Sequence, residues 1–240
     1  MAWHIFCDFD GTIATVDVTD TLLERLAAPA WQEVEQAWKA GRIGSRECLS
    51  RQVSMLDMSR EQLDRHLDTI EIDPDFPAFV TEARALGHTL MIVSDGLDLA
   101  IRRILARYRL DDLPLLANAL EPQGERAWWL AFPHCDPGCR VASGHCKCAS
   151  VRRCQPAAAS RRRTLLIGDG ASDFCAAHQV DLVFAKDKLI GHCARHDLPH
   201  FPIQGFADAR RLLGALDRIT ASLPLKPVEN EEEPEYVDSI

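Results

Sequence analysis

The sequence predicts an α/β protein with a Rossmann-like parallel sheet and a helical segment inserted after the first strand. Three short apolar runs, at 3–7, 89–93 and 164–167, each lead into a polar turn. Uniformly apolar strands of this length are typical of a parallel sheet that is buried on both faces. A fourth run, at 181–185, fits the same sheet, and a β-hairpin with a central glycine turn is predicted over 113–133.

Helical spacing separates these strands. The segment 97–108 carries apolar residues at the i, i+3, i+4, i+7 spacing of one buried helix face, namely Ile101, Ile104, Leu105 and Tyr108. Alternating strands and helices indicate an open α/β sheet. Ligands of such sheets bind beyond the carboxyl ends of the strands, where all three polar turns are expected. The turns are therefore the first candidates for a functional site.

The segment between Ala14 and Asp75 shows helical stripes and no strand pattern. Its three stripes are Leu22, Leu23 and Leu26, then Leu49, Val53 and Leu56, then Leu63, Leu67 and Ile70. We therefore predict a catalytic core formed by residues 1–14 and 76–226, with a helical cap at 15–75 inserted after the first strand.

The composition, 47% hydrophobic and 26% charged over 240 residues, is that of a globular protein. No apolar run reaches the roughly 18 residues of a membrane span, and no signal peptide precedes the first strand, so we expect a cytoplasmic protein without a membrane partner. The net charge of −9 is concentrated in the tail 227–240, which we expect to be solvated and disordered. The arginine-rich segment 140–163 has no interleaved aromatic residues, so no nucleic-acid partner is expected.

Nine cysteines, an odd number, favour a reducing compartment and free thiols. Four of them form a cysteine-rich loop with two histidines, and they are Cys135, Cys139, Cys146 and Cys148. Structural Zn²⁺ in this loop is possible but not favoured, because the spacing lacks paired C-x-x-C motifs. Thiols packed beside Lys147 are the favoured interpretation. A second hypothesis is that oxidation of Cys146 and Cys148, or of a nearby pair, disturbs this lysine.

Asp8 and Asp10 follow the first strand, and Asp169 follows the third. A carboxylate held at a strand end can act as a nucleophile toward phosphorus when a cation cancels the repulsion. A second carboxylate can protonate the leaving oxygen and then activate water. Carboxylate oxygens favour Mg²⁺. We therefore predict Asp8 as nucleophile, Asp10 as general acid and base, Thr12 as a phosphate contact, and Mg²⁺ near Asp169. A surface turn or helix N-cap is the alternative for the D-x-D pair.

The second polar turn offers donors for a phosphate. Ser94 supplies a hydroxyl, and Asp95 and Gly96 supply backbone N–H groups at the start of the next helix. Taken alone, Ser94 is equally well explained as the N-cap of that helix. Lys147 is the only lysine between residues 40 and 185, and a compact ammonium suits contact with both a carboxylate and a phosphate. A solvated surface lysine is the alternative.

Asp173 is expected in the first turn of the helix that follows GDGASD. There it would orient metal-bound water or Lys147, and we include it among the predicted metal-site residues. An acid that only complements the helix dipole is the alternative. Polar residues of the cap are candidates for substrate specificity, namely Asp17, Glu47 and Gln52.

The order DFDGT, a strand ending in Ser94, a lone Lys147 and GDGASD resembles the haloacid-dehalogenase superfamily of aspartate-nucleophile phosphatases. The insertion after the first motif resembles its C1-cap branch, which includes phosphoserine phosphatase. Further stretches resemble the MtnX-like group, which contains the phosphatase of 2-hydroxy-3-keto-5-methylthiopentenyl-1-phosphate. These stretches are Ala30-Trp31, FPAFV, Ala117-Asn118, FPH, Cys146-Lys147 and DLVFAKDKLIGHC.

The resemblance implies the haloacid-dehalogenase fold with a C1 cap, Asp8 as nucleophile, and a Mg²⁺ site of Asp8, Asp169 and the carbonyl of Asp10. It also implies that Ser94 and Lys147 contact the phosphate. The second motif departs from the family, because phosphoserine phosphatases and the salvage enzyme typically have Ser-Gly-Gly where this chain has Ser-Asp-Gly. An acid at this position is expected to change substrate preference.

We therefore expect a Mg²⁺-dependent phosphatase of a small phosphorylated metabolite, as a monomer or homodimer, with an MtnX-like substrate. A phosphatase of phosphoserine or another amino-acid phosphate is the nearest alternative, because it would share all the chemistry. A phosphomutase would return the phosphoryl group to a sugar, and a dehalogenase would not need Asp10. A non-catalytic binding protein that keeps the fold is the alternative from another class.

Overall fold

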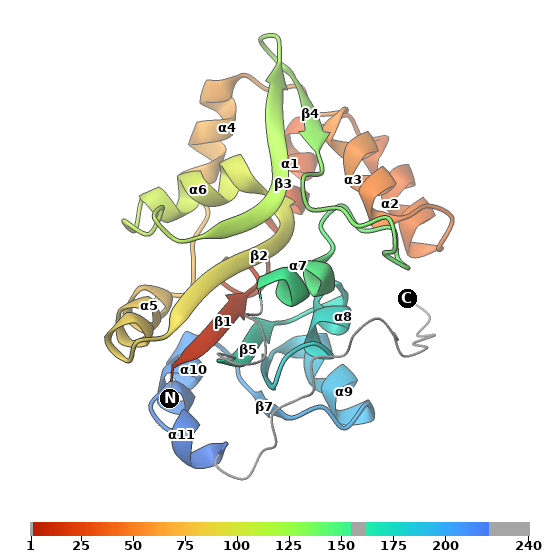
Figure 1. The fold of residues 1–240 in the computed structure, drawn as a ribbon. Helices are drawn as coiled ribbons and strands as arrows, with labels where there is room; N and C mark the ends of the chain where they lie inside the picture. The colour runs from red at the N-terminus through yellow and green to blue at the C-terminus, as the bar shows by residue number, and fades with distance from the viewer. Residues whose placement is uncertain (1, 155–161, 221–240) are drawn as a thin grey trace.

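The structure, a computed structural model, describes residues 2–154 and 162–220 and has one seven-stranded sheet in the order β4-β3-β2-β1-β5-β6-β7 (Figure 1). All neighbouring strands of the sheet are parallel except β4, which runs antiparallel to β3. The strands are β1 (Trp3–Cys7), β2 (Thr89–Leu97), β3 (Leu115–Gln123), β4 (Ala127–Ala131), β5 (Arg163–Gly168), β6 (Leu182–Ala185) and β7 (His200–Pro202). This topology confirms the predicted fold class.

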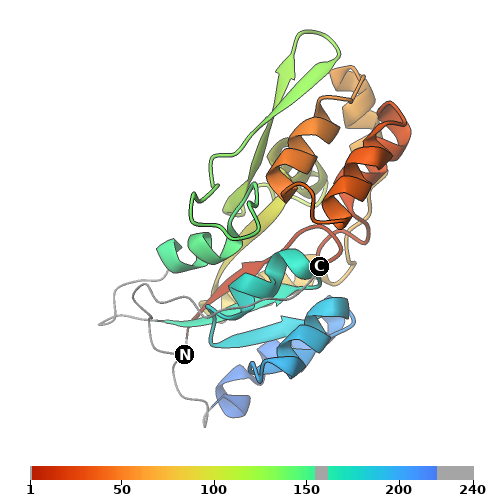
Figure 2. The ribbon, with the colours of Figure 1, turned by 90° about the vertical axis from the view of Figure 1, so that its right-hand side faces the viewer.

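Two apolar clusters cover the two faces of the sheet. Trp3, Ile5 and Cys7 of β1 belong to the larger cluster, and Phe6 belongs to the smaller one, because successive strand side chains point to opposite faces. The helices are α1 (Val18–Leu26), α2 (Trp31–Lys39), α3 (Ser45–Val53), α4 (Arg60–Leu67), α5 (Phe76–Ala85), α6 (Asp98–Ala106), α7 (Lys147–Cys154), α8 (Phe174–Ala177), α9 (Asp187–Arg195), α10 (Phe206–Leu213) and α11 (Leu216–Ile219), with a 3₁₀ turn η2 (Ala171–Asp173). Figure 2 shows the inserted helices α1–α4 at one end of the molecule and the helices α9, α10 and α11 at the other.

The structure corrects the prediction for β2. The strand does not end at 93 but continues to Leu97, with a shift of register between Val93 and Leu97. The polar residues at 94–96 therefore lie in an irregular strand end and not in a turn. Helix α6 has Leu97 as its N-cap, so the interpretation of Ser94 as that N-cap is wrong.

The sequence analysis did not single out several elements, and helix α2 and strand β7 are two of them. Helix α2 carries Trp31, Val34 and Trp38 at the i, i+3, i+7 spacing of one helix face, and of these three only Val34 is fully buried. Strand β7 has only three residues, and it is defined by its pairing with β6, in which Val183 faces His200. The predicted hairpin is confirmed, and its first strand also pairs with β2 and so extends the main sheet.

The inserted helices α1–α4 are joined to the rest of the chain by two linkers that pair with each other. Ala14 and Ile72 form an antiparallel bridge, and the Asp73 N–H donates to the Ile13 carbonyl at 2.8 Å. Leu56 of the second predicted stripe lies beyond α3 and bridges Ala27. The division into core and cap stays a prediction, but these helices do form one continuous run between β1 and α5.

The β3–β4 hairpin gives the inserted helices another attachment. The turn between α3 and α4 docks on it, because the Met58 N–H donates to the Arg126 carbonyl at 3.1 Å and the Trp128 indole donates to the Met58 carbonyl at 2.9 Å. The Arg126 guanidinium also pairs with Asp57. Figure 1 shows the hairpin extending along the inserted helices, so three connections set their position.

The predicted acidic tail, 227–240, lies outside the described residues, as does the end of the predicted core beyond 220. Within 2–154 and 162–220, no helix combines the length and the apolar character that a membrane crossing requires.

Phe206→Ala is expected to lower the free energy of unfolding by about 3–5 kcal/mol, because the ring is buried. Its centroid lies 4.8 Å from that of Phe76 and 5.1 Å from that of Phe79, so the substitution leaves a cavity between α5 and α10. Urea denaturation measures the change. Leu86→Ala, at a side chain that is 51% exposed, is the control and should change stability by less than about 0.5 kcal/mol. Equal losses in the two variants would contradict the packing described here.

Candidate active site

The tips of β1 and β5 bring the predicted carboxylates together. The Asp8 N–H donates to the Ile167 carbonyl at 2.9 Å, which continues the pairing of the two strands. After Asp8 the chain turns at Gly11, whose φ is +69°. A Cβ at Gly11 would lie 2.7 Å from Asp169 Oδ2, so only glycine suits both the backbone conformation and the close approach.

Asp8, Asp169 and Asp173 form the candidate metal centre. Each offers one carboxylate oxygen, and these atoms lie within 4.8 Å of one another. Asp8 Oδ1 accepts from the Phe9 N–H at 2.7 Å, and Asp169 Oδ1 accepts from the Thr12 hydroxyl at 3.0 Å. The Oδ2 atoms of Asp8 and Asp169 accept no hydrogen bond from any described residue and are available to a ligand. An all-oxygen set of this size suits a hard divalent cation.

The negative charge of this group is only partly balanced. Burial, and then the neighbouring Asp173, raise the pKa of Asp8 well above its ordinary value. Burial and Asp173 also raise the pKa of Asp169. Because repulsion among the carboxylates contributes to both shifts, a bound cation would lower both pKa values and stabilise the ionised forms.

Lys147 is buried at the centre of the site, so the alternative of a solvated lysine is wrong. Its Nζ lies 2.8 Å from Asp8 Oδ1, 2.8 Å from Asp173 Oδ1 and 2.9 Å from Ser172 Oγ. Asp95 Oδ1 is 3.6 Å away. Burial acts to lower the pKa of Lys147, but Asp173 and Asp8 outweigh it and hold the pKa well above its ordinary value. The lysine is therefore charged, and Asp173 orients it.

Asp173 is also fixed by the backbone around it. Its Oδ2 accepts from the N–H groups of Asp169 at 3.1 Å and Gly170 at 3.3 Å. A Cβ at Gly168 would lie 2.4 Å from the same oxygen, so the glycine at the end of β5 makes room for the carboxylate. Both oxygens of Asp173 are thus engaged, which suits a positioning role toward Lys147 and Asp169.

Asp10 links the site to the inserted helices. Its Oδ1 accepts from the Val18 N–H at 2.8 Å, at the start of α1. Burial, and then Asp17, raise the pKa of Asp10 well above its ordinary value. Asp17 is the N-cap of α1, and burial and then Asp20 raise its pKa to about 6. A carboxyl group that is readily protonated suits a general acid.

The irregular end of β2 is held by two residues that had been given no such role from the sequence. His145 Nδ1–H donates to the Ser94 carbonyl at 2.7 Å, and His145 Nε2 accepts from the Ser150 hydroxyl at 2.8 Å. Burial lowers the pKa of His145 to about 4, so the ring is neutral. Asn118 Nδ2 donates to the Asp95 carbonyl at 2.6 Å. In the sequence, His145 was only one of the two histidines of the cysteine-rich loop, and Asn118 only belonged to a stretch that resembles the MtnX-like group.

Ser94 and Gly96 lie against Asp10. The Ser94 hydroxyl accepts a hydrogen bond from the Gly96 N–H at 3.0 Å, and the Ser94 residue is only 1% exposed. A Cβ at Gly96 would lie 2.4 Å from Asp10 Oδ2. The glycine is therefore required for the close approach of β2 to the carboxylate, and this position tolerates no side chain without movement.

The three candidate specificity residues of the cap differ in their surroundings. Asp17 lies close enough to Asp10 to raise its pKa. Glu47 is exposed and pairs with Arg51 on its own helix, and Gln52 is buried and donates to Glu35 at 3.0 Å within the inserted helices. The amide of Gln52 is thus used in packing α3 against α2. A substrate contact by any of the three stays a prediction.

All nine cysteines are free thiols. Among the described residues, the groups of three or more ligating side chains whose atoms lie within 4.8 Å of one another comprise the three aspartates alone, so Cys135, Cys139, Cys146 and Cys148 form no such cluster. Cys146 Sγ lies 3.4 Å from Cys148 Sγ, and these two cysteines directly precede and follow Lys147 in the sequence. The geometry agrees with the interpretation of thiols packed beside the lysine.

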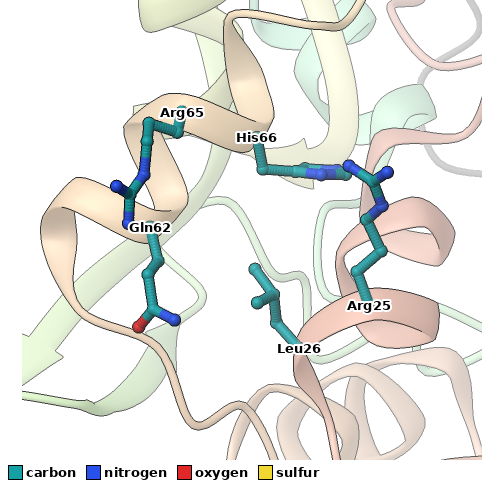
Figure 3. A pocket seen from close by; sticks show the side chains of 5 residues that line it. All are labelled: Arg25, Leu26, Gln62, Arg65 and His66. Atoms are coloured by element: carbon teal, nitrogen blue, oxygen red, sulfur yellow. The ribbon is translucent and has the colours of Figure 1, made fainter.

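Two cavities, of about 190 and 370 Å³, lie at the base of the inserted helices, between α1 and α4. They share Arg25 and His66, which point toward one another in Figure 3. His66 Nε2 is 2.9 Å from the Thr21 hydroxyl. Neither cavity is lined by the carboxylates at the strand tips, so these spaces are separate from the candidate metal centre.

The fold and the site define a hydrolase of the α/β class in which aspartates and one buried lysine meet at the carboxyl edge of a parallel sheet. Residues 5–178 match the family model described as haloacid dehalogenase-like hydrolase. The chain belongs to this family, and it is therefore an enzyme.

Its curated relatives include two that are covered over nearly their full length. A 2-hydroxy-3-keto-5-methylthiopentenyl-1-phosphate phosphatase of Brevibacillus brevis is 32% identical over 212 residues, which cover 87% of this chain and 94% of the relative. The protein of the same name from Geobacillus kaustophilus is 31% identical over 218 residues, covering 90% and 96%. These similarities support the MtnX-like resemblance.

Solved structures with the same fold include phosphoserine phosphatases. One, a phospho-aspartyl intermediate analogue of phosphoserine phosphatase, superposes with a TM-score of 0.65 at 18% identity, and the match covers 89% of this chain and 98% of that structure. A probable phosphoserine phosphatase from Vibrio cholerae gives a TM-score of 0.69 at 20% identity, covering 94% and 68%. At these identities the likeness establishes the fold, which agrees with the predicted C1-cap branch.

Lys147→Met is expected to lower the free energy of unfolding by about 3–5 kcal/mol in metal-free buffer, because it leaves Asp8 and Asp173 buried without their cation. Asp8→Asn should cost much less, since it removes one of the repelling charges and leaves Lys147 paired with Asp173. Lys188→Met, at an exposed position, is the control. Urea denaturation compares the three variants, and a Lys147→Met protein as stable as Lys188→Met would contradict this account of the buried charges.

Proposed function

We propose that this hydrolase is a Mg²⁺-dependent phosphatase that transfers the phosphoryl group of a small metabolite to Asp8 and then to water. The observation that carries the proposal is the position of the Asp8 carboxylate. Its Oδ1 is fixed by Lys147 and by the Phe9 N–H, and its Oδ2 accepts no hydrogen bond from the residues that the structure describes. A nucleophile requires one oriented oxygen with an open path, and this arrangement supplies it.

The donor set fits Mg²⁺, because three buried or half-buried carboxylates converge within 4.8 Å and offer oxygen ligands only. Asp169 would hold the ion through its free Oδ2 atom, together with the Asp8 carboxylate and the carbonyl of Asp10. Bound there, Mg²⁺ would supply charge neutralisation for the carboxylates and the phosphoryl oxygens. Thr12 and Asp173 would keep Asp169 in place from opposite sides, through its Oδ1 and its backbone N–H.

The protein groups can be assigned to successive proton and phosphoryl transfers. Asp8 Oδ2 attacks phosphorus, and the bond from phosphorus to the leaving oxygen breaks. Asp10, whose pKa is raised by burial and by Asp17, gives its proton to that oxygen. Asp10 is then a carboxylate and takes a proton from the water that attacks the aspartyl-phosphate. Phosphate leaves, and Asp8 is regenerated.

Lys147 and the end of β2 would bind the phosphoryl oxygens. The ammonium lies 2.8 Å from the nucleophile, so it also approaches any group that bonds to Asp8. The Ser94 hydroxyl, with its oxygen accepting from the Gly96 N–H, has its own proton free for a phosphoryl oxygen. His145 and Asn118 would act as positioning residues, because they hold the backbone of this strand end.

The substrate class is proposed from the relatives. Proteins about 30% identical over nearly the whole chain carry the name of one enolic phosphate phosphatase, so a small sugar-like phosphate of this kind is the first candidate. Phosphoserine or another amino-acid phosphate is the second. It is favoured by Asp17, a carboxylate near Asp10 that would be stabilised by a substrate ammonium group.

Asp8→Asn is expected to lose phosphatase turnover by at least about 10³-fold while keeping the fold, because the amide is not a nucleophile. The assay is phosphate release with Mg²⁺ from a panel that includes an aryl phosphate, 2-hydroxy-3-keto-5-methylthiopentenyl-1-phosphate and phosphoserine. The wild type should prefer the second compound and lose activity with EDTA. Circular dichroism confirms the fold of the variant. Wild-type protein that releases no phosphate from any compound would support the non-catalytic alternative instead.

Gly96→Ala is expected to reduce kcat by about 10²-fold, because the added Cβ would meet Asp10 Oδ2 at 2.4 Å and displace the proposed general acid. Gly191→Ala is the matched control, since a Cβ there meets no atom within 4 Å. The rates of both are compared on the best substrate of the panel. Unchanged kcat in Gly96→Ala would show that Asp10 has no positional role in turnover.

A further inference from the structure

The smaller of the two cavities between α1 and α4 offers positive charge that its own walls do not neutralise. Its lining residues, shown in Figure 3, are Arg25, Leu26, Gln62, Arg65 and His66, and none of them is acidic. The guanidinium groups of Arg25 and Arg65 form no hydrogen bond or ion pair with any residue that the structure describes. The cavity is therefore a candidate site for an anion.

The acidic residues nearest to this cavity are paired elsewhere or lie outside it. Asp64 of α4 pairs with Arg60 on the same helix. Glu71, which lines the larger cavity, pairs with Arg107. Glu24 also lines the larger cavity and not the smaller one. The countercharge for the two unpaired arginines is thus left to a ligand.

Gln62 adds a neutral donor whose direction is fixed. Its Oε1 accepts from the Ser59 N–H at 2.9 Å and from the Arg126 guanidinium at 3.0 Å. Because both partners are donors, the oxygen and the nitrogen of this amide cannot exchange places. The Gln62 Nε2 donates to no residue in the described part of the chain, so it is available to an acceptor in the cavity.

His66 adds an acceptor that has no donor. The residue is 7% exposed, and its buried Nδ1 has no hydrogen-bond partner among the described residues. The Thr21 hydroxyl donates to the Val18 carbonyl at 2.8 Å, so it must accept from His66 Nε2 at 2.9 Å. Nε2 therefore carries the proton of the neutral ring, and Nδ1 has a bare lone pair. Burial, and then Arg25, lower the pKa of His66 and keep the ring neutral. A buried lone pair without a partner indicates a missing donor.

Hydrogen phosphate is a small anion that meets both demands. Its charged oxygens accept from guanidinium and amide groups, its two negative charges match two arginines, and its O–H can donate to a lone pair. Sulfate has no such proton at neutral pH, and a phosphate monoester, with a second pKa of about 6, has largely lost its own at pH 8. The cavity volume of about 190 Å³ equals that of about six water molecules, which suits a small ion.

We propose that the cavity formed by Arg25, Gln62, Arg65 and His66 is a binding site for hydrogen phosphate, separate from the candidate metal centre. The two guanidinium groups and the Gln62 amide donate to its oxygens, and its O–H donates to His66 Nδ1. The bound ion joins α1 to α4, because Arg25 lies in the last turn of α1 and the other three residues lie on α4. Binding does not depend on the proposed function, although a phosphatase would release this ion as its product.

The experiment titrates the ¹⁵N-labelled full-length protein with sodium phosphate at pH 8, in metal-free buffer at constant ionic strength, and follows the backbone amides by NMR. We expect saturable shifts at the residues that line the cavity, and none there with equal concentrations of sulfate, bicarbonate or phenyl phosphate. Arg25→Met and Arg65→Met should each raise the Kd for phosphate by at least about 10-fold, since each removes a charge-assisted hydrogen bond. Arg46→Met is the matched control, because this exposed arginine of α3 makes no side-chain contact with a described residue, and it should leave the Kd unchanged.

His66→Gln tests the lone pair separately from the charges. The glutamine Nε2 can donate to Thr21 as the His66 Nε2 does, but it provides no acceptor in place of Nδ1. We expect weaker phosphate binding and loss of the preference for phosphate over sulfate. The amide spectrum away from the cavity reports whether the variant keeps its fold.

Three results would overturn the proposal. One is phosphate shifts that do not saturate or that map to the strand tips alone. Another is binding of sulfate, bicarbonate or phenyl phosphate in the cavity as tight as that of phosphate. The third is that Arg25→Met and Arg65→Met bind phosphate as Arg46→Met does. The titration needs no turnover, so a protein that binds phosphate here but hydrolyses no phosphate ester would refute the proposed function and leave this site established.

Discussion

The structure of this site depends on a buried ammonium group that is surrounded by carboxylates. Lys147 contacts Asp8 and Asp173 at 2.8 Å, and Asp95 lies at 3.6 Å. Removing such charges from water costs several kcal/mol for each ion, and the cost is offset only where geometry and hydrogen bonds are good. Here the start of α7, the tip of β1 and the turn η2 must meet for this to happen. The position of Asp8, the proposed nucleophile, is therefore set by an electrostatic contact between three segments that are distant in sequence.

Most of the site could be predicted from the sequence because its residues lie at places that a pattern marks. Asp8 and Asp169 each follow an apolar strand, and neighbouring parallel strands end at the same edge. Lys147 was identified by the scarcity of lysine in a region that uses arginine. The supporting roles of His145 and Asn118 were not predicted, because each bonds to a backbone carbonyl of β2. No local pattern encodes a contact with a backbone atom some distance along the chain.

The fold shows the same division between local and non-local information. The buried strands and the hairpin were predicted because their apolar runs are continuous. The continuation of β2 to Leu97 was missed, since the polar sequence at 94–96 is that of a turn and only its tertiary bonds make it a strand end. Helix α2 was not singled out, although Trp31, Val34 and Trp38 lie on one helix face, and only Val34 of the three is fully buried. Such a helix depends on its neighbours, as in the Gln52–Glu35 contact with α3.

A hydrogen bond connects the inserted helices to the proposed acid, and the carboxylates near this bond affect which substrates can bind. Asp10 accepts from the first N–H of α1, so a movement of α1 also moves the group that would protonate the leaving oxygen. Asp17 caps the same helix. Asp95 adds a further carboxylate 3.6 Å from Lys147. At an effective dielectric constant of about 20, a second carboxylate at about 4 Å from these acids would be repelled by about 4 kcal/mol. A substrate that carries its own carboxylate, such as phosphoserine, meets this repulsion, whereas an uncharged ketone or thioether chain does not. We therefore propose that the acid in the second motif favours a phosphate ester whose remainder is uncharged.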